Sequence, residues 1–149
     1  MLESNLASFP IEANLKHEKN GDEDKVDVTL LKKIVGSLKY QCYNMGDIEF
    51  SVGLVSRYMD DPRVSHMKDA RRILRYINGT TIHDILFPIS TNDNDVMIMC
   101  YLSSNWYGYK YDRRSTIAYF FKVFDALKSW GSRNQPVVAL SSGELEYIA

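Results

Sequence analysis

The chain has 149 residues, of which 45% are hydrophobic and 25% are charged, and its formal net charge at pH 7 is -1. This composition is typical of a globular chain that buries one sizeable core, and it excludes disordered and fibrous classes. The near-zero net charge gives no global electrostatic reason to expect a nucleic-acid or membrane partner, so local patches have to decide. No stretch approaches 18 uninterrupted apolar residues, so we expect no membrane partner.

The two cysteines, Cys42 and Cys100, are far apart and form no CxxC or Cys/His arrangement. We therefore expect reduced thiols and no zinc site. The first residues include Glu3 and Asn5, where a secretion signal would carry positive charge and then an apolar run. These features predict an intracellular chain, cytoplasmic or nuclear, that is not secreted.

Residues 1–29 are acidic and contain few aromatic side chains, which predicts an extended lead-in or linker. Within it, only Phe9-Pro10-Ile11 has the apolar character needed to dock on another element. A first helix is predicted from Leu30 to Leu38, because apolar residues recur there at intervals of three and four. Thr29 is the predicted N-cap of this helix.

A second helix is predicted over Ile48 to Met59, and Asp60-Asp61-Pro62 should end it because the residue before proline avoids the helical region. We interpret this acidic pair as a helix terminator and not as a metal site. A third helix is predicted to follow a cap at Ser65 and to stop in a left-handed turn at Asn78-Gly79.

The third predicted helix has an apolar face and a basic stripe on the roughly opposite side. Four basic residues fall within about 100° around the helix axis: Lys68, Arg71, Arg72 and Arg75. One interpretation is a solvated helix face. The other is a ridge that follows the phosphate backbone of a nucleic acid, because Lys and Arg side chains release counterions from the phosphates without contacting the bases.

The second half of the chain has the pattern of strands. The apolar run at 85–87 predicts a short strand, and the polar cluster at 90–95 predicts a domain boundary. Three antiparallel strands are predicted next, at Val96–Ser103, Thr116–Phe124 and Leu127–Ser132, with a hairpin turn at Asp125-Ala126. Ser141 and Glu144 have capping-box spacing and predict the start of a helix. The predicted class is α+β, divided into a linker (1–29), a helical region (30–88) and a sheet region (89–149).

Two long motifs resemble copia-type retrotransposon Pol polyproteins. Residues 66–80 read HMKDARRILRYINGT and follow that family's pattern H-W-x-A-A-K-R-I-L-R-Y-L-K-G-T. Residues 139–149 read ALSSGELEYIA and match A-L-S-S-T-E-A-E-Y-I-A in the family's RNase H region. Between them, the family's Y-S-D-S-D-W-A-G and D-R-K-S-T-S-G-Y patterns match at Tyr101, Trp106, Gly108, Asp112, Arg113, Ser115, Thr116 and Tyr119. The resemblance implies a reverse-transcriptase connection region followed by the N-terminal half of an RNase H-like domain, in a truncated and diverged copy.

The resemblance also implies what the catalytic site has lost. RNase H action uses carboxylates around two divalent metal ions, Mg²⁺ in the active family. Glu146 matches the family's catalytic Glu, whereas Ser103 and Asn105 stand at two acidic positions, and the last Asp would fall beyond Ala149. A serine hydroxyl is neutral near pH 7, so we expect no bound metal and no cofactor. Glu144 is expected to act only as a cap.

The sequence thus predicts a fragment of a copia-type Pol polyprotein that is by itself catalytically inactive. The family's activities are reverse transcription and cleavage of RNA–DNA hybrids, and no Tyr-x-Asp-Asp polymerase motif occurs here. The alternative is a non-catalytic module that binds RNA–DNA hybrid or DNA through the basic helix at 65–79. A third possibility is a relic without a role. In every case an open sheet edge would favour self-association.

Overall fold

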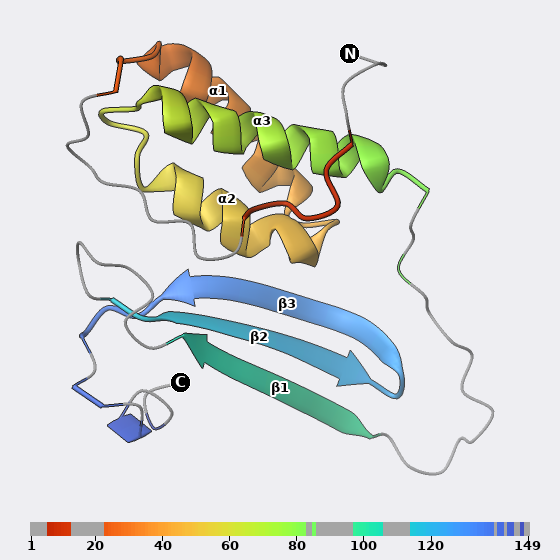
Figure 1. The fold of residues 1–149 in the computed structure, drawn as a ribbon. Coiled ribbons are helices and arrows are strands. Elements are labelled where there is room, and N and C mark those ends of the chain that lie inside the picture. Colours follow the sequence, from red (N-terminus) through yellow and green to blue (C-terminus); the bar gives the residue numbers. More distant parts are fainter. Residues whose placement is uncertain are drawn as a thin grey trace. The chain divides into compact units, whose positions relative to one another are not determined.

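The computed structural model describes residues 6–12, 23–82, 97–105 and 114–138, together with Ile85, Leu140, Ser141, Gly143, Glu144 and Tyr147. The chain divides into two compact units, Met1–His83 and Asp84–Ala149, and each unit is described by itself. Helices come first and a three-stranded antiparallel sheet follows, which confirms the expected α+β class (Figure 1). The strand predicted at 85–87 and the boundary at 90–95 lie outside the described residues, apart from Ile85.

The first helix, α1, spans Val28–Gln41. Its N-cap is Asp27, whose carboxylate accepts a hydrogen bond of 2.8 Å from the backbone N–H of Thr29. The prediction of Thr29 as the cap is therefore wrong. Asp27 is the better acceptor, because its side-chain oxygen satisfies an N–H group that has no partner inside the helix.

The second predicted helix is shorter than expected. It consists of a 3-10 turn, η1 (Gly46–Ile48), followed by α2 (Glu49–Ser56). The Oγ of Ser56 donates to the carbonyl of Gly53 at 2.7 Å, and the N–H of Tyr58 bonds to Val55 at 3.1 Å in a tighter turn. Tyr58 is only 2% exposed and stacks on the imidazole of His66, with ring centroids 3.8 Å apart. The helix therefore ends before Pro62, at the turn where the ring of Tyr58 is buried.

The third helix, α3, spans Val64–Gly79, and both of its predicted ends differ from the observed ones. The N-cap is Arg63, so Ser65 lies inside the helix and the prediction of Ser65 as the cap is wrong. Gly79 is helical, and the helix ends at Thr80, whose N–H bonds to the carbonyls of Tyr76 and Ile77 at 3.1 Å. The predicted left-handed stop is therefore also wrong.

The three helices pack against one another (Figure 1), and their side chains form one buried core. The nine members of this core are Leu31, Val35, Leu38, Ile48, Val52, Val55, Met67, Ala70 and Ile73. The hydroxyl of Tyr76 on α3 donates to the carboxylate of Asp47 in η1 and links the two elements. This hydrogen bond raises the pKa of Tyr76 to about 12. The apolar residues that recur at intervals of three and four in α1 therefore face this core, although the periodicity misplaced helix ends.

The sheet contains β1 (Ile98–Asn105), β2 (Thr116–Val123) and β3 (Ala126–Asn134) in the order β1-β2-β3 (Figure 1). β1 lies two residues later than predicted, and β3 is longer at both ends. The hairpin turn falls on Phe124 and Asp125, one residue before its predicted place. Phe124 has a positive φ of 55°, an uncommon backbone conformation for a bulky residue.

A cross-strand row of aromatic side chains runs over one face of the sheet. Tyr101 pairs with Phe120, and Phe120 pairs with Trp130, so all three lie at matching register positions. The rings of Tyr101 and Phe120 are stacked, with centroids 4.5 Å apart. Such cross-strand pairs are the main side-chain source of stability in an antiparallel sheet.

The ring of Tyr119 lies over Gly131, its partner on β3. A Cβ atom at position 131 would lie 2.5 Å from the nearest atom of the Tyr119 ring, so the observed packing requires glycine there. Among the described residues of β1, β2 and β3, the buried hydrophobic side chains are limited to Ala126. Among the described residues, strand pairing therefore contributes more to the sheet than burial of apolar side chains does.

Candidate nucleic-acid interface

The basic stripe of α3 lies opposite the buried face of the helix. Each residue of an α-helix advances by about 100° around the axis, which separates Arg71 and Arg75 from Ile73 by roughly half a turn. Ile73 is fully buried, whereas Lys68 and Arg71 are exposed. The one acidic residue of α3 is Asp69, which is 8% exposed and lies on the buried side. The acidic side chain of the helix thus lies on the side that faces the core.

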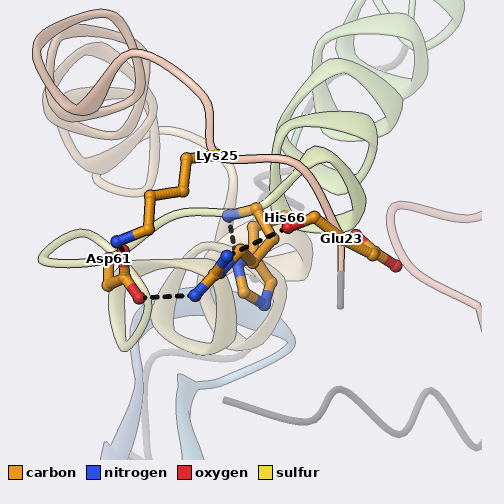
Figure 2. A network of polar contacts seen from close by, with 5 residues as sticks. Glu23, Lys25, Asp61 and His66 are labelled. Atoms are coloured by element: carbon orange, nitrogen blue, oxygen red, sulfur yellow. Dashed lines mark hydrogen bonds and ion pairs between the residues drawn. The ribbon is translucent and has the colours of Figure 1, made fainter. Parts of the chain in front are cut away.

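The N-terminus of α3 is held by residues far away in the sequence. The carboxylate of Glu23 accepts a hydrogen bond of 2.8 Å from the N–H of Ser65, and this bond lowers the pKa of Glu23. The Nδ1 atom of His66 accepts the N–H of Arg63 at 3.0 Å (Figure 2). A carboxylate at this end of a helix also interacts favourably with the helix dipole. These contacts fix the direction in which α3 presents its basic stripe.

Asp61 connects the segment before α1 to the segment before α3 (Figure 2). Its carboxylate contacts Nζ of Lys25 at 3.0 Å and the guanidinium of Arg63 at 2.9 Å. The hydrogen bond from Lys25 and the charge of Arg63 lower the pKa of Asp61. The neighbouring Asp60 lies 3.7 Å from Lys32. The structure thus places both aspartates of the Asp-Asp-Pro sequence in ion pairs.

Arg72, predicted as part of the stripe, already has partners within the chain. Its Nη1 atom lies 2.6 Å from the carboxylate of Glu12, and its Nε atom donates to the carbonyl of Phe9 at 3.3 Å. The segment at 6–12 therefore docks on α3 through a carboxylate and a backbone carbonyl, while the ring of Phe9 stays 68% exposed. Of the predicted stripe, this contact leaves Lys68, Arg71 and Arg75 without an observed ion pair among the described residues.

An open hollow runs along the other flank of the stripe. Its lining, within the described part of the chain, is Lys68, Arg71, Leu74, Arg75, Ile77, Asn78 and Thr81. The Nε atom of Arg75 is buried and makes no hydrogen bond within the described part of the chain. The hollow therefore combines three cationic side chains with the apolar stems and side chains that lie between them.

The position of the predicted catalytic remnant is only partly described. Ser103 is exposed on β1 and pairs with Ala118. Glu146, the side chain of Asn105 and residues 106–113 lie outside the described residues. In the sheet from Ile98 to Val123 and on to Asn134, the described residues include one carboxylate, Asp125, which lies in the hairpin turn at the opposite end of β2 from Ser103.

These described residues do not fit a magnesium site. Mg²⁺ binding depends on carboxylate charge, and the hydroxyl of Ser103 brings none. Across the described ranges, no group of three or more His, Cys, Asp or Glu side chains is placed to hold a metal ion. None of the helices in those ranges is long and apolar enough to cross a membrane.

Near the C-terminus, Ser141 and Glu144 are placed as a helix start requires. The N–H of Glu144 donates to Oγ of Ser141 at 3.1 Å, and the carboxylate of Glu144 accepts the N–H of Leu140 at 2.7 Å. Two acceptors thus satisfy N–H groups at the beginning of a helix. The structure shows Glu144 in a capping contact.

Sequence reasoning missed Glu23, Arg63 and His66, which cap α3, and it missed Glu12 as the partner of Arg72. The three-residue spacing from Arg63 to His66 is the spacing of a capping box, but Arg and His are not the residues that identify one. Glu23 and Glu12 act across 42 and 60 residues of sequence. No local pattern identifies such pairs.

Two retrotransposon Pol polyproteins of plants are similar in sequence to this chain. The chain is 36% identical over 121 residues to the Retrovirus-related Pol polyprotein from transposon RE1 of Arabidopsis thaliana, a match covering 81% of this chain and 8% of the polyprotein. It is 35% identical over 133 residues to the Pol polyprotein from transposon TNT 1-94 of Nicotiana tabacum, covering 89% of this chain and 10% of that protein. The chain belongs to the copia-type retrotransposon Pol family.

A third relative is of the chain's own size. The Secreted RxLR effector protein 161 of Plasmopara viticola is 34% identical over 116 residues, which cover 77% of this chain and 80% of that protein. No protein-family model and no solved structure matches the chain. The Pol family is thus shown by relatives, and this chain corresponds to about a tenth or less of the two Pol polyproteins.

Proposed function

We propose that the chain is a catalytically inactive piece of a copia-type Pol polyprotein that binds the phosphate backbone of a nucleic-acid duplex through α3. The observation that carries this proposal is the stripe opposite the buried face of the helix, in which Lys68 and Arg71 are exposed and Arg75 is half-buried beside the hollow. Long cationic side chains spaced along one helix face meet successive phosphates without reading base sequence. Such a role predicts an intracellular chain with RNA–DNA hybrid or DNA as its partner.

The contacts around α3 support a fixed binding surface. Its buried face packs in the helical core, and Glu23 and His66 hold its N-terminus. A surface that is held in place loses less conformational entropy on binding than a mobile one. The alternative of a solvated face predicts no measurable affinity for a duplex, even at low salt.

The direct test is the binding of a fluorescently labelled RNA–DNA hybrid, measured by anisotropy over a series of salt concentrations. Changing Lys68, Arg71 and Arg75 together to Ala should abolish binding, because it removes the three cations proposed to contact phosphates. For the wild type, three such contacts give a slope of log K against log salt of about -3. A matched control changes Lys32, Lys33 and Lys39 on α1 to Ala, which removes the same charge from the same unit. Equal weakening by both triple variants would contradict a site on α3.

We also propose that the chain does not cleave the hybrid. The neutral hydroxyl of Ser103 replaces a charged ligand, so paired magnesium ions have too few carboxylates to bind. Hydrolysis of an RNA–DNA hybrid with Mg²⁺ or Mn²⁺ should not exceed that of a Glu146→Ala variant. Turnover clearly above this variant would show that the carboxylate at position 146 is still in use.

Self-association through the sheet is a second proposal, and one observation favours it. Within the described sheet β1 pairs on one side only, with β2, and Ile98 and Leu102 on it are 66% and 58% exposed. An exposed strand with apolar side chains is a template for a second chain. Sedimentation should show concentration-dependent association that Leu102→Lys reduces. A monomer at all concentrations would overturn this proposal.

A further inference from the structure

The segment at 6–12 lies along one flank of the basic stripe. It touches α3 at two places: Arg72, which contacts Glu12 and Phe9, and Gly79, where an added Cβ atom would lie 3.5 Å from Leu6. Positions 72 and 79 are seven residues apart, which is nearly two full helical turns, so they lie on the same side of α3. The segment therefore follows the helix along the edge of the proposed phosphate-binding surface.

The contact engages the part of Arg72 that would hold a phosphate. A guanidinium binds a carboxylate or a phosphate with the same planar set of N–H donors. In this structure Nη1 of Arg72 donates to the carboxylate of Glu12 at 2.6 Å and Nε donates to the carbonyl of Phe9 at 3.3 Å. An acidic side chain and a backbone oxygen of the chain itself thus stand where phosphate oxygens would bind.

We propose that Glu12 occupies Arg72 in competition with nucleic acid and so limits the phosphate-binding surface of α3 to Lys68, Arg71 and Arg75. This inference rests on the proposed function and adds regulation to the same site. Release of the segment at 6–12 adds a fourth cation to the surface. Neutralising the carboxylate of Glu12, or displacing it from Arg72, then strengthens duplex binding.

The expected size of the effect follows from exposure. The side chains of Glu12 and Arg72 are 62% and 26% exposed, so solvent screens their ion pair and the pair is readily exchanged. Removing it should raise the affinity for a duplex by about two- to five-fold. The slope of log K against log salt should become steeper by about 0.9, because one more phosphate is neutralised.

The experiment measures binding of the labelled RNA–DNA hybrid by four full-length variants. Glu12→Ala frees Arg72. Asp60→Ala is the matched control, because it also removes one negative charge from the helical unit, at a residue that is paired with Lys32 on α1 and not with a residue of the stripe. Arg72→Ala alone should change the wild-type affinity little. Arg72→Ala combined with Glu12→Ala should return the affinity to the wild-type value.

The outcomes separate this inference from the proposed function. A gain with Glu12→Ala that is absent in Asp60→Ala and lost on adding Arg72→Ala supports the competition. Binding that depends on Lys68, Arg71 and Arg75 but is unchanged by Glu12→Ala, or raised equally by Asp60→Ala, overturns the competition and leaves the proposed function standing. If neither the wild type nor Glu12→Ala binds at low salt, both are overturned.

Discussion

The helical unit and the sheet unit of this chain are stabilised in different ways. The helices enclose nine buried apolar residues, while the described strands bury one apolar side chain, Ala126. Large side chains of the sheet such as Tyr101 and Leu102 are 45% and 58% exposed. Strand pairing can therefore define a sheet whose described residues bury little apolar surface, whereas the helices depend on their contacts with one another.

The stability of the two units should respond very differently to an isoleucine-to-alanine substitution, and the loss in the helical unit should be the largest of all the effects predicted. Ile73→Ala removes a fully buried side chain and should cost about 2–5 kcal/mol of unfolding free energy, because it leaves a cavity in the core. Ile98→Ala, at a residue 66% exposed, should cost less than about 0.5 kcal/mol. Urea unfolding followed by circular dichroism measures both. Similar losses at the two sites would contradict the contrast between the units.

The two cysteines, one in each unit, should differ in the reactivity of their thiols. Burial raises the pKa of Cys42 to about 11, and its Sγ donates to the carbonyl of Leu38 at 3.3 Å, whereas Cys100 on β1 is exposed. At about pH 8 only about a thousandth of Cys42 is thiolate, so its reaction with a maleimide should be slow. Labelling of the Cys42→Ser and Cys100→Ser variants should differ in rate by about 100-fold or more. Equal rates would show that α1 opens readily.

Glycine substitutions should have opposite signs in the two units. Gly131→Ala forces the ring of Tyr119 aside and should destabilise the sheet by about 1–2 kcal/mol. Gly36→Ala, in the middle of α1 with no atom within 4 Å of the added Cβ, should stabilise the helices by about 0.5–1 kcal/mol. Thermal melting checks both. Adding Tyr119→Ala should remove the penalty at position 131, and a penalty that persists would point to the backbone instead.

The smallest expected effect is the pH dependence that Asp61 gives to the stability of the helical unit. The hydrogen bond from Lys25 and the charge of Arg63 lower its pKa in the folded state. Its contribution to stability is therefore present above the ordinary pKa of about 3.9 and is lost as the pH falls through the lowered value. In a series of unfolding curves at decreasing pH, Asp61→Asn should lose stability in acid less steeply than the wild type. Asp125→Asn in the sheet hairpin is the control, because it leaves the contacts of Asp61 with Lys25 and Arg63 intact.

The arrangement of side chains around α3 could be predicted from the sequence, because spacing along one helix was sufficient. The four basic residues and the apolar face of α3 were placed on opposite sides by periodicity alone, and the structure confirms that arrangement. That Arg72 is already paired was not predicted. Its partner Glu12 is 60 residues away, and the sequence of that segment predicted docking through apolar side chains and not through a carboxylate.

Local periodicity was sufficient to predict the order of helices and strands, the apolar faces of the helices and the basic stripe, because these depend on repeats of three to four residues in helices and two in strands. The positions at which the helices begin and end, and the cations that stay open to a ligand, depend on tertiary contacts. Glu23 at the start of α3, the buried ring of Tyr58 after α2 and Glu12 at Arg72 act through contacts between distant segments. Such contacts exist only once the chain has folded, because no local pattern of residues specifies them.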